Sequence, residues 1–193
     1  GNDQEIMSLE DMVQLFNLEK CSKAGARFNY QKLVWFNHEY IMNKSDEEVA
    51  DLFKPILESN GVNESRERII KAVSLVKNRV NFVGELWNQT SYLFKAPESY
   101  DEKSLKKWWK DEAPQTTAEL CDFIENEPVF EGSVLEPRVM EWIASKGYGI
   151  GKVMNALRVT LVGAAVGPHI FEITDFIGKE ETLSRARKAI ASL

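Results

Sequence analysis

The residue types that most often carry catalysis or bind metal ions are scarce in this sequence. Its two histidines, His38 and His169, stand in no His-x-x-x-His frame, and its two cysteines, Cys21 and Cys121, are far apart in the chain. A transition-metal site is marked by such ligands at short, regular spacing, and a disulfide framework by a larger set of cysteines. The spacing therefore predicts no metal site and no disulfide, and the sparse thiols suit a reducing cytoplasm.

A glycine-rich stretch from Gly147 to Gly151 has the composition of a loop that cradles phosphate. Its glycine spacing matches neither common nucleotide fingerprint, no strand is predicted before it, and no Lys-Ser or Lys-Thr pair follows it. A flexible turn between two helices is the better interpretation. No serine lies in a nucleophile-elbow context either, so residue types and spacing alone predict no active site within the 193 residues.

Basic side chains remain as the groups best able to bind an anion. The sequence has 24 Lys and Arg against 30 Asp and Glu, and this net charge of −6 argues against a general nucleic-acid binder. The charge is uneven, because residues 138–193 contain 8 basic and 5 acidic residues, whereas residues 1–137 contain 16 and 25. The last third is therefore the better place for an anionic partner. In it, a solvated basic face is predicted from Lys179, Arg185, Arg187 and Lys188.

The elements that must position these side chains are predicted to be helical. A hydroxyl residue followed three positions later by an acid, the capping-box pattern, precedes apolar stripes at Ser8/Asp11, Ser45/Glu48, Thr116/Glu119 and Ser133/Glu136. Asn29 is predicted to cap a further helix, and Pro168 to occupy the first position of another, which Gly178 ends. No persuasive strand is found. The pattern predicts an all-α chain of about ten helices.

Breaks in the helical pattern predict where the chain divides. Turn-forming residues gather at positions 42–45, 60–63, 96–99 and 126–132, and the third group separates an N-terminal helical half from a C-terminal one. The chain is therefore predicted to form two elongated helical lobes. Its 44% hydrophobic and 28% charged residues suit a soluble globular protein. The longest apolar run contains Arg158 and is too short for a membrane span, and no leader sequence is visible.

Three long segments of the chain are recognisable. Ser8 to Ile41 reads SLEDMVQLFNLEKCSKAGARFNYQKLVWFNHEYI, Leu75 to Phe94 reads LVKNRVNFVGELWNQTSYLF, and Gly151 to Ile190 reads GKVMNALRVTLVGAAVGPHIFEITDFIGKEETLSRARKAI. The first resembles the segment that follows the catalytic signature loop of glutamyl-tRNA synthetases. The second is similar to a helix pair of that family, and the third to its C-terminal end. The resemblance covers nearly the whole chain and is weakest from residue 97 to 134.

The resemblance implies that this chain is the anticodon-binding C-terminal part of a bacterial-type glutamyl-tRNA synthetase, a class I glutamate–tRNA ligase. The family's HIGH and KMSKS-type signatures do not occur here, so this part alone is expected to be inactive and to hold no cofactor. The full-length enzyme would use ATP and Mg²⁺. The resemblance divides the chain into the end of the stem-contact region (1–44), a first helical anticodon-binding bundle (45–100) and a second one (101–193). It implies a cytoplasmic monomer that binds the anticodon loop of glutamate tRNA, and neither DNA nor a membrane.

The same resemblance assigns residues to the binding site. The arginine of the family's Leu-Val-x-x-Arg helix falls on Arg79, and that of its Pro-Leu-Arg turn falls on Arg158, although Ala156 replaces the proline. The loop before the Phe-Glu-Ile helix contributes Gly167, Pro168 and Ile170. Single-stranded RNA loops are recognised by a few fixed hydrogen-bond donors and apolar platforms, so an acidic net charge is no objection.

Several interpretations of these residues stay open. The chain belongs either to a ligase that discriminates against glutamine tRNA or to a non-discriminating one that also accepts it, or it is a helical protein-interaction scaffold with no role in RNA binding. An arginine on a helix is often only solvated or ion-paired, and Arg79 would alternatively cap the last carbonyls of its own helix. The adjacent Trp108 and Trp109 point about 100° apart on a helix, and one of them is predicted to lie in the core.

Overall fold

Helices are the only regular secondary structure in the residues that the structure, a computed structural model, describes: 5–21, 25 and 27–193. These residues form eleven α-helices and three 3₁₀ helices and no strand, so the all-α prediction is confirmed. None of the described helices is long and apolar enough to cross a membrane. The α-helices are α1 (Leu9–Leu15), α2 (Tyr30–Asn43), α3 (Asp46–Ser59), α4 (Arg66–Val76), α5 (Leu86–Phe94), α6 (Glu102–Trp108), α7 (Ala113–Asn126), α8 (Gly132–Lys146), α9 (Ile150–Val162), α10 (Ile170–Ile177) and α11 (Lys179–Ser192). The 3₁₀ helices are η1 (Leu18–Lys20), η2 (Lys77–Arg79) and η3 (Val83–Glu85).

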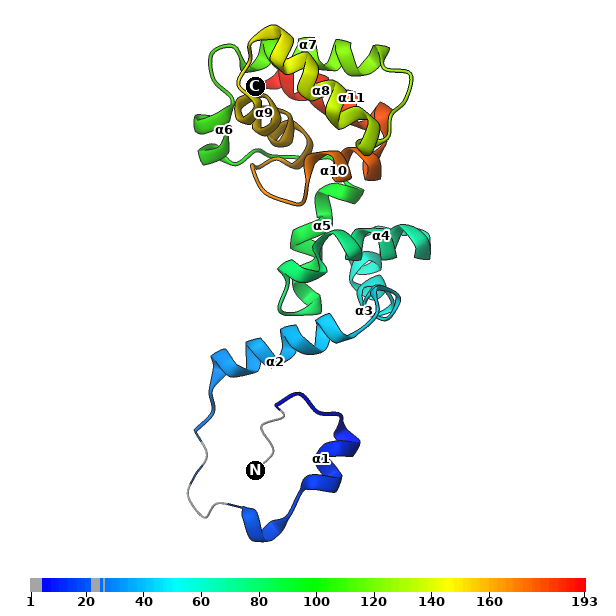
Figure 1. Cartoon of the computed structure of the whole chain (residues 1–193), viewed down its shortest axis with the longest axis vertical. Coiled ribbons are helices and arrows are strands. Elements are labelled where there is room, and N and C mark those ends of the chain that lie inside the picture. Colours follow the sequence, from blue (N-terminus) through cyan, green and yellow to red (C-terminus); the bar gives the residue numbers. More distant parts are fainter. Residues whose placement is uncertain (1–4, 22–24, 26) are drawn as a thin grey trace.

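The helices follow one another along a single long axis, with α1 and α2 toward one end, α3 to α5 in the middle and α6 to α11 gathered at the other end (Figure 1). Two apolar clusters hold them together. One surrounds Phe53 and is built mainly by α3 and α4, and the other surrounds Leu120 and is built mainly by α7 to α11. Helix α5 joins the two clusters, because Leu86 packs in the first and Leu93 in the second. The predicted boundaries of the two bundles stay a prediction.

Several helix ends lie where the sequence predicts them. Ser8 and Ser45 form the predicted capping boxes of α1 and α3, and the side chain of Asn29 accepts a hydrogen bond at the start of α2. Gly147 ends α8 in the left-handed conformation with φ +72°, and Gly149 precedes α9, so the glycine-rich stretch is a turn between helices, as predicted. Each of the four predicted breaks contains a junction between helices, and those at 42–45 and 126–132 also include the end residues of the flanking helices.

The starts of three helices differ from the prediction. Helix α7 begins at Ala113, because Pro114 suits the first turn, and this places Thr116 inside the helix instead of at its cap. Helix α8 begins at Gly132, whose N–H donates to Asp175 Oδ1 at 2.6 Å, so a contact with α10 and not Ser133 sets its start. Helix α10 begins at Ile170, two residues later than the predicted start at Pro168, and Gly178 ends it as predicted.

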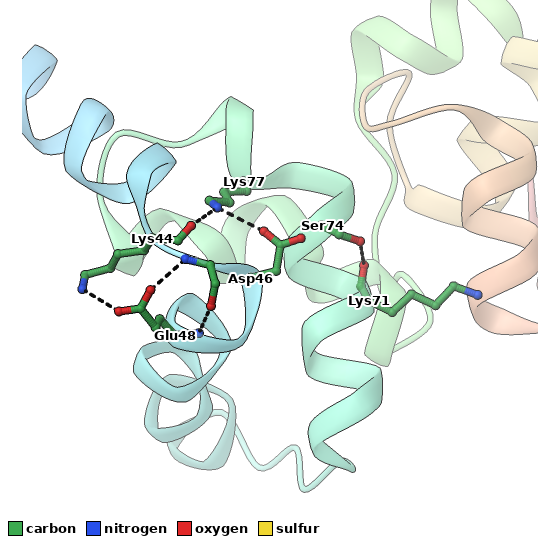
Figure 2. A network of polar contacts seen from close by, with 7 residues as sticks. Lys44, Asp46, Glu48, Lys71, Ser74 and Lys77 are labelled. Carbon is green, nitrogen blue, oxygen red and sulfur yellow. Dashed lines mark hydrogen bonds and ion pairs between the residues drawn. The ribbon is translucent and has the colours of Figure 1, made fainter.

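A network of polar contacts fixes the corner where α2, α3 and η2 meet. Figure 2 shows the ammonium group of Lys77 between the carbonyl oxygen of Lys44 and the carboxylate of Asp46, 3.1 Å away. In the same corner Ser45 and Glu48 complete the capping box of α3, with the Ser45 N–H 2.8 Å from Glu48 Oε2. Because Lys77 begins η2, the network also anchors the start of the short segment that ends at Arg79.

Candidate nucleic-acid interface

The main chain next to Arg79 is anchored to α2, while the side chain of Arg79 is exposed. From α2, His38 Nδ1 donates to the carbonyl oxygen of Val80 at 2.8 Å, and the Asn37 amide donates to that of Asn81. The Arg79 guanidinium makes no hydrogen bond or ion pair with any residue that the structure describes, so it caps no carbonyl of its helix. The sequence predicted Arg79 but missed the role of Asn37 and His38, which lie in the recognisable Trp-x-Asn segment.

Arg158, on α9, is half-buried and partly engaged. Its Nη1 donates to the carbonyl oxygens of Pro168 at 2.6 Å and Val166 at 3.2 Å, and its other nitrogens have no partner in the described part of the chain. Burial lowers the pKa of Arg158, the nearby Tyr92 opposes this effect, and the positive charge of Arg79 lowers the pKa further. A buried guanidinium is costly without partners. Two carbonyls therefore supply part of what Arg158 needs, and the rest of its fork is free for a ligand.

Tyr92 lies beside both arginines and was not predicted as a site residue. Its side chain is only 7% exposed, and its hydroxyl has no hydrogen-bond partner among the described residues. Burial raises the pKa of Tyr92 to about 12, and the charges of Arg79 and Arg158 partly offset this rise. Gly167 closes over the ring at φ +107°, where a Cβ atom would lie 2.9 Å from the Tyr92 hydroxyl oxygen. The one sequence signal that could have found it is a tyrosine on the buried face of α5, beside Leu86, Thr90 and Leu93.

The structure thus gathers Arg79, Arg158, Gly167 and the Pro168 carbonyl around Tyr92, and we call this group the arginine site. The side chains of Pro168 and Ile170 are buried, and Ile170 belongs to the core around α7 to α11. Of these two residues, only the Pro168 carbonyl contacts the arginine site, through Arg158 Nη1. The function predicted for all five residues stays a prediction.

The loop that completes the arginine site is anchored at several points. Asp101 N donates to the carbonyl oxygen of Gly163 at 2.7 Å, and Ala165 N donates to Ser104 Oγ at 3.0 Å. Gly163 has φ +84°, and a Cβ atom there would lie 2.7 Å from a backbone oxygen, so only glycine fits. The anchored loop leaves the apolar side chain of Val166 exposed at its tip.

The basic residues of α11 form only in part the solvated face that the sequence predicts. Arg185 is 4% exposed, and its guanidinium donates to the carbonyl oxygens of Tyr92 at 2.5 Å and Leu161 at 3.1 Å, and to Glu181 at 2.7 Å. These two carbonyls lie in the last turns of α5 and α9. The last carbonyl groups of a helix have no hydrogen-bond partner within that helix. Arg187 pairs with Glu125 on α7, and Lys179 donates to carbonyls at the end of α7. The prediction was wrong for Lys179, Arg185 and Arg187, because these cations join helices, whereas Lys188 is exposed as predicted.

A protein-family model described as the anticodon binding domain matches residues 48–190, well over half of the chain. The chain belongs to the anticodon-binding domain family. This anticodon-binding domain is 49% identical over 193 residues to a glutamate–tRNA ligase of Porphyromonas gingivalis and 50% identical to one of Phocaeicola vulgatus. Each match covers 100% of this chain and 38% of the relative, so the domain spans about two fifths of the length of these ligases, in their C-terminal part.

Solved structures agree with this assignment. A glutamate tRNA ligase from Elizabethkingia meningosepticum, crystallised with its amino acid, superposes with a TM-score of 0.90 at 40% identity, over 98% of this domain and 38% of that chain. A glutamate-tRNA synthetase from Elizabethkingia anophelis superposes with a TM-score of 0.85 at 39% identity, over 98% and 37%. The resemblance predicted from the sequence is confirmed.

Proposed function

We propose that this anticodon-binding domain binds the anticodon loop of glutamate-specific tRNA, as part of a ligase that attaches glutamate to that tRNA with ATP and Mg²⁺. One observation carries the proposal: the main chain is anchored before Arg79 by Lys77 and after it by Asn37 and His38, yet its guanidinium is unpaired among the described residues and close enough to Tyr92 and Arg158 for its charge to lower the pKa of both. A fixed, unoccupied donor fork beside an apolar ring suits an unstacked base. We further propose that the ligase is a cytoplasmic monomer and that this domain alone does not catalyse ATP–pyrophosphate exchange.

The chemistry of the Arg79 guanidinium favours one base at the last anticodon position. Glutamate anticodons end in cytosine, whereas the near-cognate glutamine anticodons end in guanine. Cytosine presents O2 and N3 as acceptors on its Watson–Crick edge, and an arginine fork has only donors to offer. Guanine presents N1–H and an exocyclic amine, so it would set donors against donors and leave them unpaired. Arg79 is therefore proposed to read cytosine and to reject guanine.

The test compares the domain with its Arg79→Gln variant on two anticodon stem-loop RNAs that end in cytosine and in guanine. We expect the parent to prefer cytosine by about 1–3 kcal/mol, and the variant to lose this preference. Arg66→Gln is the matched control, because Arg66 is exposed and its guanidinium is paired with Asp51. It removes the same charge and should keep the preference.

Each other outcome contradicts part of the proposal. Equal affinity of the parent for both stem-loops would support the non-discriminating ligase instead. A variant that loses affinity for both RNAs equally would make Arg79 a phosphate contact. No binding of either stem-loop by the parent at low salt would support the protein-interaction scaffold and remove the RNA-binding proposal.

A further inference from the structure

A second concave site lies away from the arginine site, between α6, the α6–α7 turn and the start of α9. It is a cleft of about 630 Å³, within the range of small-molecule sites, and we call it the lysine cleft. The side chains that matter for its chemistry are Lys107, Lys110, Lys152, Trp108 and Thr116. Trp108 and its neighbour Trp109 are both half-buried, so the prediction that one of them is a core residue was wrong.

The ammonium groups around the lysine cleft are unpaired. Lys107, Lys110 and Lys152 are exposed, and none of them forms an ion pair with an acid in the described part of the chain. Lys107 Nζ lies 4.6 Å from the centre of the Trp108 ring. The nearby Lys106 pairs with Glu102 on its own helix. The rim also carries two exposed acids, Asp111 and Glu112, so a ligand must place its negative charge toward the three lysines.

The floor of the lysine cleft holds a polar group without a partner. Thr116 is 8% exposed, and its hydroxyl makes no hydrogen bond with any described residue. By contrast, the buried Thr90 and Thr160 donate to carbonyls of their own helices at 2.7 Å. The hydroxyl oxygen itself is not among the fully buried unpaired atoms of the described residues, so it opens into the cleft and can bond to a ligand there. The buried Val153 beside Thr116 gives the floor an apolar part as well.

The start of α9 adds backbone donors at the edge of the same cleft. No side chain caps this helix, because Gly149 occupies the cap position. The first N–H groups of a helix have no partner within it, and such groups attract anions. Gly147 and Gly149 line the cleft without side chains, so a ligand can approach this backbone closely.

We propose that the lysine cleft is a nucleotide subsite that holds one unstacked nucleotide of the tRNA beside the anticodon. Its base would lie against the Trp108 ring and the apolar floor, with Thr116 as a hydrogen-bond partner, and its phosphates against Lys110 and Lys152. Bases of single-stranded RNA stack on aromatic side chains while basic residues hold the backbone. Lys152 and Arg158 lie about 9 Å apart along the axis of α9 and about 120° apart around it, so an RNA strand that contacts both sites must pass around this helix. The inference rests on the proposed function, because it extends the same RNA footprint.

The test measures the affinity of the 193-residue chain for the cytosine-ending stem-loop by fluorescence anisotropy at several salt concentrations. The double variant Lys110→Ala/Lys152→Ala should bind roughly tenfold more weakly, and the slope of log K against log salt should fall by about 1.4, because two phosphate contacts are lost. The matched control is Lys103→Ala/Lys106→Ala, which removes two exposed charges of α6 that do not line the cleft. It should change the affinity less than twofold.

Thr116→Val tests the floor with almost no change in volume. It should weaken binding roughly threefold to tenfold, with no loss of melting temperature, because the hydroxyl has no partner to lose in the free domain. Equal affinities for the two lysine variants, or an unchanged affinity for Thr116→Val, would overturn the nucleotide subsite while leaving the arginine site intact. If the parent chain binds no stem-loop at all, the proposed function and this inference both fail.

Discussion

The arginine site and helix α11 both carry arginines, but the two regions use them in opposite ways. In the arginine site, Arg79 is exposed and unpaired among the described residues, and Arg158 keeps part of its guanidinium free. On α11, Arg185 is buried with three acceptors and Arg187 is paired with Glu125. The difference shows that the third of the chain with the most positive charge uses much of that charge to join helices. In the arginine site, by contrast, Arg79 has no acceptor among the described residues and Arg158 uses only one of its nitrogens.

The largest effect should come from Arg185→Ala. The carbonyls of Tyr92 and Leu161, near the ends of α5 and α9, would lose a buried donor. We expect the free energy of unfolding to fall by about 2–4 kcal/mol, measured by urea denaturation followed by circular dichroism. Arg187→Ala is the control, because its exposed pair with Glu125 contributes at most about 1 kcal/mol. Equal losses from the two variants would erase the contrast between buried and exposed arginines on α11.

Arg158→Ala should change binding more than stability. The loop would lose the donor to Val166 and Pro168, which costs about 1 kcal/mol of stability. Affinity for the stem-loop should fall roughly tenfold to a hundredfold. Arg158→Lys separates charge from shape, since an ammonium keeps the charge but cannot make the same fork. A stability loss as large as that of Arg185→Ala would show that Arg158 belongs with the structural arginines.

Tyr92→Phe should alter the alkaline stability of the domain. The tyrosine ionises near pH 10 in the unfolded chain but at about 12 in the folded one, so the unfolded state loses its proton first. The stability that Tyr92 contributes is therefore complete below pH 10 and is lost as the pH rises toward 12. The variant should match or exceed the parent in melting temperature at pH 7, because the hydroxyl is unpaired, and should decline less between pH 10 and 12. Identical alkaline profiles would show that Tyr92 is hydrated in the folded state.

Arg79→Gln should have the smallest effect on stability. Its guanidinium contacts no acceptor among the described residues. The free energy of unfolding should therefore change by no more than about 0.5 kcal/mol, and the melting temperature should shift correspondingly little. Differential scanning calorimetry of the variant and the parent at equal pH provides the measurement. A larger loss would mean that Arg79 stabilises the fold and would weaken the contrast with α11.

Local features of this chain were determined by the sequence itself. The caps of α1, α2 and α3 and the glycine stops after α8 and α10 were predicted because each depends on residues within about four positions of one another. The all-α class follows from the same short-range signals. The family resemblance brought Arg79 and Arg158 to attention, but it did not indicate what surrounds them.

Tertiary structure alone decided how the longer-range groups are used. A side chain of α10, Asp175, holds the start of α8, and Arg185 reaches the ends of two helices that lie far from it in sequence. Gly167 and Tyr92 meet only because α5 and α9 pack together. Whether a cation is free or occupied depends on which acceptors lie within about 3 Å of it. In a helical fold, those acceptors come from packed helices and not from neighbours in the chain, so no local pattern of residues records them.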